Sequence, residues 1–140
     1  MIHHLSLGVR DLSQAGVFYD SALGALGYRR VFEDDTAIGY GLIDEEDVLC
    51  LKLSPGTQPP GPGFHLAFAA CSRSAVDLFH TSALKIGGRC NGPPGLRPDY
   101  GAGYYAAFLI DPDGHRIEAL CKDVAPLATP ASKPASKACL

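Results

Sequence analysis

The chain has 140 residues, of which 46% are hydrophobic and 19% are charged, as in an ordinary globular protein large enough to bury a core. Its formal net charge of −3 and its scattered Lys and Arg residues argue against a nucleic-acid partner. No apolar run approaches the roughly 20 residues that cross a bilayer. The N-terminus shows no secretory signal, so we expect a cytoplasmic protein without a membrane partner.

The cysteine pattern favours free thiols. Five cysteines are present, an odd number, and no two of them are spaced as C-x-x-C. Neither a zinc knuckle nor a disulfide framework is therefore indicated. The cysteines are Cys50, Cys71, Cys90, Cys121 and Cys139.

The strongest organisational signal is an internal repeat. A displacement of 61 residues aligns 4–28 with 65–89 without a gap, and eight of the 25 aligned positions are identical. Chance would give roughly one or two identities at this composition. The identical pairs include His4 with His65. The chain is therefore interpreted as a duplicated module.

Each copy predicts one strand, a helix and three further strands. The strands expected in the first copy are 2–9, 29–33, 36–43 and 47–53. The strands expected in the second copy are 64–70, 89–91, 104–110 and 115–121. The sequence Asp-Pro-Asp-Gly at 111–114 predicts a tight turn between the last two strands, because Pro presets φ and Gly tolerates a positive φ.

A capped helix follows the first strand of each copy. Asp11, with Gln14 three residues later, resembles a capping box, and Ser72 is the equivalent cap in the second copy. Apolar residues recur at helical spacing after both caps, and glycines at 27 and 87–88 end the helices.

These elements define one domain over 1–124. The first module covers 1–53 and the second covers 64–122, with a Pro- and Gly-rich linker at 54–63. The remaining residues, 125–140, repeat Pro-Ala-Ser-Lys and predict a disordered tail.

Strand alternation places His4, His65 and Glu118 on sheet faces that the helices do not cover. In the first copy Cys50 holds the position that Glu118 holds in the second. Two imidazoles and one carboxylate form a competent ligand set for a divalent metal such as Zn, Ni, Fe or Mn, with coordination positions left open. The alternative is that these residues are merely polar groups on a solvated face.

A long loop is expected at 93–103, and loops of this length in small domains are often functional. Arg97 could pair with an anionic group of a substrate. Tyr100 and Tyr104 could stack on a ligand or hydrogen-bond to it, which makes all three candidate substrate-binding residues. Alternation does not decide whether Tyr104 or Tyr105 faces the pocket, and an ordinary exposed loop is the alternative.

The other histidines are not expected to join the site. His3 should point to the face opposite His4. His80 lies in the second helix and His115 follows the tight turn, and both are expected at the surface.

Together these motifs resemble the vicinal oxygen chelate superfamily, which includes glyoxalase I, the bleomycin resistance proteins and the extradiol dioxygenases. The resemblance covers about residues 1–122. It rests on His-Leu-Ser-Leu at 4–7, His-Leu-Ala-Phe at 65–68, and Asp-Pro-Asp-Gly at 111–114 running into Ile117-Glu118. It implies an α+β fold of two tandem βαβββ modules that form a U-shaped mixed half-barrel, with helices outside, around a divalent metal.

The resemblance also implies where the metal ligands lie. Ligands of that family sit on the first and fourth strands of each module, which correspond here to His4, Cys50, His65 and Glu118. A glyoxalase I would carry a carboxylate at the position of Cys50, so lactoylglutathione lyase activity itself is not expected. The remaining two histidines and one carboxylate are also the set that dioxygenases of the superfamily use.

The resemblance predicts a glyoxalase-like, metal-dependent enzyme of the lyase, isomerase or dioxygenase type. It would act on a small oxygen-rich substrate, with Glu118 as ligand and base. The alternative is a metal-free ligand-binding protein of the bleomycin-resistance type. The two modules could pair within one chain or across a homodimer, in which His4 of one subunit would join His65 and Glu118 of the other.

Overall fold

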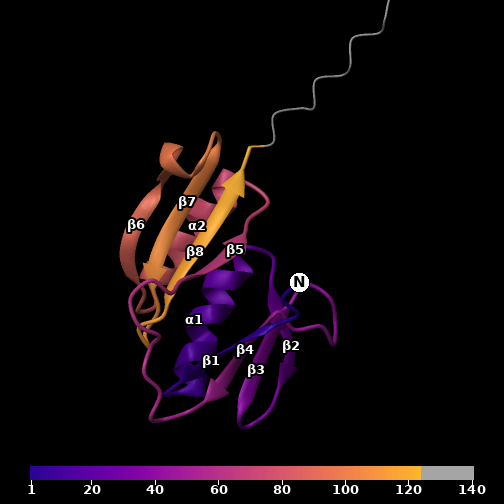
Figure 1. The fold of residues 1–140 in the computed structure, drawn as a ribbon. Helices are drawn as coiled ribbons and strands as arrows, with labels where there is room; N and C mark the ends of the chain where they lie inside the picture. The colour runs from indigo at the N-terminus through magenta and orange to yellow at the C-terminus, as the bar shows by residue number, and fades with distance from the viewer. Residues whose placement is uncertain (124–140) are drawn as a thin grey trace, which may run out of the picture.

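A computed structural model describes residues 1–123, which form two βαβββ modules in tandem (Figure 1). The first module contains β1 (Leu5–Val9), α1 (Leu12–Gly24), β2 (Arg29–Glu33), β3 (Ala37–Gly41) and β4 (Leu49–Leu53). The second contains β5 (Leu66–Ala69), α2 (Arg73–Leu84), β6 (Arg89–Leu96), a short 3₁₀ helix (Pro98–Tyr100), β7 (Tyr104–Ile110) and β8 (Arg116–Lys122). The predicted α+β class and tandem modules are confirmed. The predicted tail at 125–140 lies outside the described residues.

The helices begin where their caps predict. The Asp11 carboxylate accepts a hydrogen bond from the Gln14 amide at 2.9 Å, and the Ser72 hydroxyl accepts one from the Ala75 amide at 3.1 Å. Each bond satisfies an amide that the first helical turn leaves without a partner. Beyond the helices, Gly27 adopts a φ of +88°, a left-handed conformation that favours glycine.

The two sheets repeat the same topology. Their strand orders are β1-β4-β3-β2 and β5-β8-β7-β6, with the first pair of each parallel and the others antiparallel. Ser6 lies opposite Cys50 in the first sheet, and Ala67 lies opposite Glu118 in the second. Cys50 and Glu118 therefore occupy equivalent positions.

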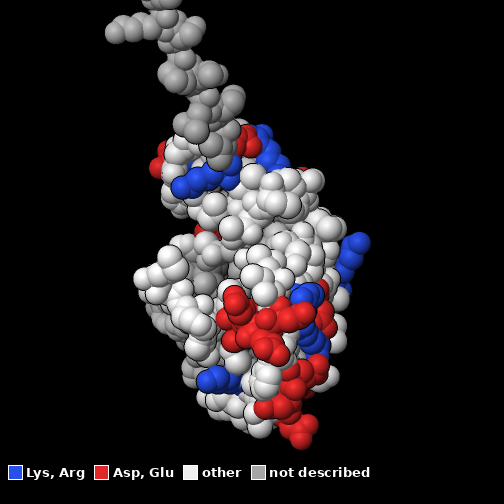
Figure 2. All heavy atoms as spheres, turned by 90° about the vertical axis from the view of Figure 1, so that its right-hand side faces the viewer, with Lys and Arg blue, Asp and Glu red and all other residues white. Residues whose placement is uncertain are grey.

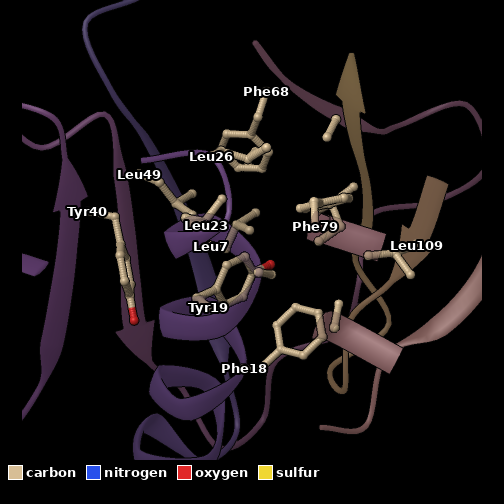
Figure 3. Packing of buried hydrophobic residues seen from close by; sticks show 14 of the residues in the cluster. Leu7, Phe18, Tyr19, Leu23, Leu26, Tyr40, Leu49, Phe68, Phe79 and Leu109 are labelled. Atoms are coloured by element: carbon tan, nitrogen blue, oxygen red, sulfur yellow. The ribbon is translucent and has the colours of Figure 1, made fainter. Parts of the chain in front are cut away.

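A shared core joins the modules (Figure 3). Each helix packs on its own sheet and the two helices pack on each other, so the layers follow the order sheet, α1, α2, sheet. Phe18 of α1 and Phe79 of α2 are fully buried in the cluster between them. Each sheet thus has a helix on one side and a face free of helices on the other. The strands do not close into a barrel.

The predicted loop at 93–103 is wrong in its first part. β6 extends to Leu96, well beyond the predicted strand at 89–91, and pairs with β7 through two register shifts. Pro93 and Pro94 suggested a loop, yet β6 is an edge strand, where a residue without an amide hydrogen is tolerated.

A buried polar network connects the β7–β8 turn to the first module. Asp111 is 1% exposed, and its Oδ2 accepts hydrogen bonds from the Tyr19 hydroxyl at 2.7 Å and from His115 Nδ1 at 2.9 Å. Beside it, the Arg10 guanidinium donates to Asp113 at 3.0 Å. The expectation that His115 lies at the surface is wrong, because its imidazole is held inside by Asp111.

Two buried phenols predict a limit to stability at high pH. Burial raises the pKa of Tyr19, with the Asp111 carboxylate adding to the effect, and burial raises the pKa of Tyr40, which also donates to Asp20. Unfolding above the ordinary tyrosine pKa of about 10 therefore releases protons, and the free energy of unfolding falls as the pH rises from there. Below that pH their contribution is fully present.

The measurement is an alkaline titration that follows tyrosinate absorbance together with circular dichroism. We expect Tyr19 and Tyr40 to ionise only as the fold is lost. Ionisation of these two phenols with the fold intact would contradict this expectation.

Acidic side chains dominate one face of the first module (Figure 2). They gather over the lower half of that view, whereas Lys and Arg are separated from one another there. The hairpin between β3 and β4 carries Asp44, Glu45 and Glu46, all of which are exposed. This face is therefore predominantly acidic. Within residues 1–123, no helix is long and apolar enough to span a membrane.

Candidate functional site

Glu118 forms the floor of the candidate site. It lies in the middle of β8, where its neighbours Ile117 and Ala119 point into the core and leave its carboxylate on the face free of helices. Glu118 is nevertheless only 2% exposed. His65, just before β5, places Nε2 at 3.0 Å from Glu118 Oε2, and its side chain is 52% exposed. The imidazole therefore lies between the buried carboxylate and solvent.

Tyr104 completes the hydrogen bonding of this carboxylate. Its hydroxyl donates to Glu118 Oε1 at 2.6 Å, so the two carboxylate oxygens have different partners. Burial and this hydrogen bond raise the pKa of Tyr104 to about 12, which keeps the phenol protonated and donating at neutral pH. Tyr105 packs against the core instead and donates to Asp77. The structure thus decides which tyrosine faces the pocket.

A cavity of about 360 Å³ opens above the carboxylate. It is lined by His65, Tyr100, Tyr104, Phe108 and Glu118. Arg97 stands beside this lining, with its guanidinium 5.4 Å from the centre of the Phe108 ring and a hydrogen bond to the Pro93 carbonyl. The walls are therefore aromatic and the floor is acidic.

Phe108 is a lining residue that the sequence prediction missed. It lies on β7 directly opposite Glu118, four residues after Tyr104 and on the same face. Strand alternation from Tyr104 would have identified it once the orientation of β7 was known.

His4 lies apart from this pair. It is exposed in front of β1, and its Nδ1 lies 2.9 Å from Nδ1 of His3. The expectation that His3 points away from His4 is wrong, because β1 begins only at Leu5 and alternation does not extend to either residue. Within residues 1–123, no three His, Cys, Asp or Glu side chains come close enough together to hold a metal ion. One chain therefore brings together two of the three predicted ligands, His65 and Glu118.

Cys50 gives the first module a different chemistry. Cys50 is buried. Burial is the largest cause of the raised pKa of its thiol, and the negative charge of Asp47 adds to the effect. Metals bind the thiolate, which such surroundings disfavour. The equivalent positions of the two sheets therefore supply one carboxylate and one neutral thiol.

The pair formed by His65 and Glu118 fits part of a metal shell. Two ligand atoms at about 2.1 Å from one ion and at right angles to each other are about 3.0 Å apart, as these two atoms are. Imidazole nitrogen and carboxylate oxygen suit the same divalent metals. The hydrogen bond from Tyr104 fixes the carboxylate, as the outer partners of metal ligands commonly do.

Comparison with known proteins gives a consistent result. The family model described as Glyoxalase/Bleomycin resistance protein/Dioxygenase superfamily matches residues 1–119. A search of curated proteins finds no match. The chain is 34% identical to a glyoxalase/bleomycin resistance protein from Albidiferax ferrireducens T118, with a TM-score of 0.72 over 84% of this chain and 95% of that one.

Two further structures share the fold. A glyoxalase-related enzyme from Fulvimarina pelagi is 22% identical, with a TM-score of 0.67 over 86% of each chain. Glyoxalase I from Zea mays is also 22% identical, with a TM-score of 0.67 over 84% of this chain but only 44% of its own.

Proposed function

Because the chain belongs to the Glyoxalase/Bleomycin resistance protein/Dioxygenase superfamily, we propose that it is a metal-dependent enzyme that acts on a small oxygen-rich molecule. The observation that supports this proposal is the pair His65 and Glu118 at the base of an aromatic cavity. A divalent metal such as Zn, Ni, Fe or Mn, held by these two residues, would polarise a carbonyl or two neighbouring oxygens of the substrate. The reaction would be of the lyase, isomerase or dioxygenase type.

The protein itself would orient the substrate and shield it from water. The rings of Tyr100, Tyr104 and Phe108, which line the cavity, would stack on a flat substrate and displace water from it. Tyr104 would keep one oxygen of Glu118 occupied, so that the other oxygen faces His65 and the substrate.

The third ligand would be His4 of the partner subunit in a homodimer. β1 and β5 are edge strands of their sheets, and an unpaired edge is a template for another strand. An apolar crevice of about 190 Å³ also opens between Leu5 at one edge and Leu66 at the other, with exposed Ile2 at its rim. A second copy that joined these edges would set the open face of its first module opposite Glu118.

Subunit mixing tests the metal site and the dimer together. We expect His4→Ala and His65→Ala each to abolish bound metal and the metal-dependent shift in melting temperature, whereas His3→Ala keeps both. When the two inactive variants are refolded together, half of the dimers are mixed and each holds one intact site. About a quarter of the sites should then return.

The outcomes separate the two parts of this proposal. A wild-type protein that binds no divalent metal, with no shift in melting temperature, would remove the enzyme proposal. If His4→Ala still bound metal, His4 would not be a ligand, and the metal would be held by His65 and Glu118 without a partner subunit. If mixing the two variants did not restore metal binding, the site would not be shared between subunits.

The second candidate is a metal-free binding protein of the bleomycin-resistance type. The aromatic lining of the cavity and the neutral thiol of Cys50 favour it. It predicts that a flat cationic aromatic compound binds the chelator-treated protein as tightly as the untreated protein, as measured by calorimetry. Binding that depends on added metal would exclude it.

A further inference from the structure

A histidine and a cysteine meet on the flank of the second module, away from the cavity. His80 of α2 places Nε2 at 3.2 Å from the sulfur of Cys90 on β6. Cys90 pairs with Leu109, whose side chain lies in the core, so this flank belongs to the helix side of the sheet and Glu118 to the other. The expectation that His80 lies at the surface is wrong, since the residue is only 8% exposed.

The pair has no counterpart in the first module. The 61-residue repeat places Tyr19 at the position of His80, and the strand pairings of the two sheets place Arg30 at that of Cys90. The Tyr19 hydroxyl bonds to Asp111, so that helix position serves the contact between the modules. The fold therefore does not require a histidine next to a cysteine.

The surroundings suit an imidazole that accepts a proton. Burial lowers the pKa of His80, an effect that the nearby Asp77 carboxylate opposes. An unprotonated ring nitrogen within hydrogen-bonding distance of a thiol can act as its base. The buried ring is held by the packing of α2, while its partner sulfur belongs to an exposed residue.

The backbone of β6 leaves the cysteine accessible. β6 is the edge strand of its sheet, and its register with β7 shifts between Cys90 and Gly92. Such bulges re-aim side chains and interrupt pairing. A small reagent can therefore approach the sulfur from the open edge.

We propose that Cys90 is a reactive thiol, with His80 as its base, that forms a mixed disulfide with a low-molecular-weight disulfide. His80 Nε2 takes the thiol proton as the Cys90 sulfur attacks one sulfur of the reagent. The new S–S bond forms while the old one breaks, and the departing thiolate takes the proton from His80. One disulfide and one thiol are consumed and one of each is produced, so no other oxidant is needed.

The test compares Cys90 with Cys71 in the full-length protein. Cys71 is also exposed, but its sulfur lies near the Ser72 hydroxyl and not near an imidazole. Rates of modification at pH 7 by oxidised glutathione, and separately by iodoacetamide, are read for each cysteine by peptide mass spectrometry. Only a few per cent of an ordinary thiol is ionised at this pH, so a base 3.2 Å from the sulfur, which removes the proton as the bond forms, speeds the reaction. We therefore expect Cys90 to react about three- to tenfold faster.

A second comparison uses a variant in which His80, the proposed base, is replaced. His80→Asn should reduce the rate at Cys90 to that of Cys71 and leave the Cys71 rate unchanged, and Cys90→Ser should remove the adduct. Equal rates at the two cysteines of the wild-type protein would overturn the proposal, and this comparison does not depend on whether the His80 variant folds. A Cys90 rate that His80→Asn leaves unchanged in a folded protein would overturn it as well.

Discussion

Asp111→Ala is expected to lower the free energy of unfolding by about 4 kcal/mol. The two carboxylate oxygens accept four hydrogen bonds, from the Tyr19 hydroxyl, from His115 Nδ1 and from the backbone amides of Asp113 and His115. Truncation leaves these donors buried, and each unsatisfied donor costs about 1–3 kcal/mol, with partial relaxation among neighbours. The loss falls on the contact between the two modules, because Tyr19 belongs to α1.

Urea denaturation followed by circular dichroism measures this effect. Tyr19→Phe removes only one of the four donors and should cost about 1–2 kcal/mol. Asp35→Ala, at an exposed position, is the matched control and should change stability by less than about 0.5 kcal/mol. If Asp111→Ala were no more destabilising than Asp35→Ala, the network would not hold the modules together.

Glu118→Gln is expected to weaken divalent-metal binding by about 100-fold or more. The amide keeps the size of the side chain and can still accept the hydrogen bond from Tyr104, so the cavity should retain its shape. What is lost is the negative charge beside His65, on which the proposed metal affinity depends. Metal titration by calorimetry gives the affinity, and the melting temperature of the metal-free variant reports on its fold.

The internal repeat supplies a control for this experiment. Cys50 occupies in the first sheet the position of Glu118 in the second. Cys50→Ala should change metal affinity by no more than about twofold, because the protonated thiol is not a ligand. A larger loss with Cys50→Ala would make the thiolate a fourth ligand. Unchanged affinity with Glu118→Gln would remove the carboxylate from the site.

Local signals were sufficient for most of the fold. Asp11 and Ser72 identified both helix starts, and the 61-residue repeat gave equivalent strands in both modules. The alternation around Glu118 correctly separated the open face of β8 from the core. These features depend on neighbouring residues or on the repeat, both of which are visible in the sequence itself.

Long-range contacts were not predictable in the same way. His115 and Asp111 are buried where their turn meets α1 through Tyr19, 92 residues from Asp111 in the sequence, and nothing within the turn indicates that contact. The separation of His4 from the other two predicted ligands depends on how the helices pack, which spacing does not reveal. Alternation placed His4, His65 and Glu118 on one common face. In a single chain His4 lies beside the first sheet, whereas His65 and Glu118 lie at the second.

The docking of the β7–β8 turn onto α1 would constrain the assembly of the proposed dimer. The Asp111 and Asp113 contacts hold the modules of each chain in one relative orientation before any partner arrives. A rotation of the second module that brought His65 next to His4 of the same chain would break these contacts and expose Asp111 and Asp113 to water. Monomers would therefore associate as preformed rigid units, and exchange between intrachain and intermolecular pairing would be slow and would require partial unfolding.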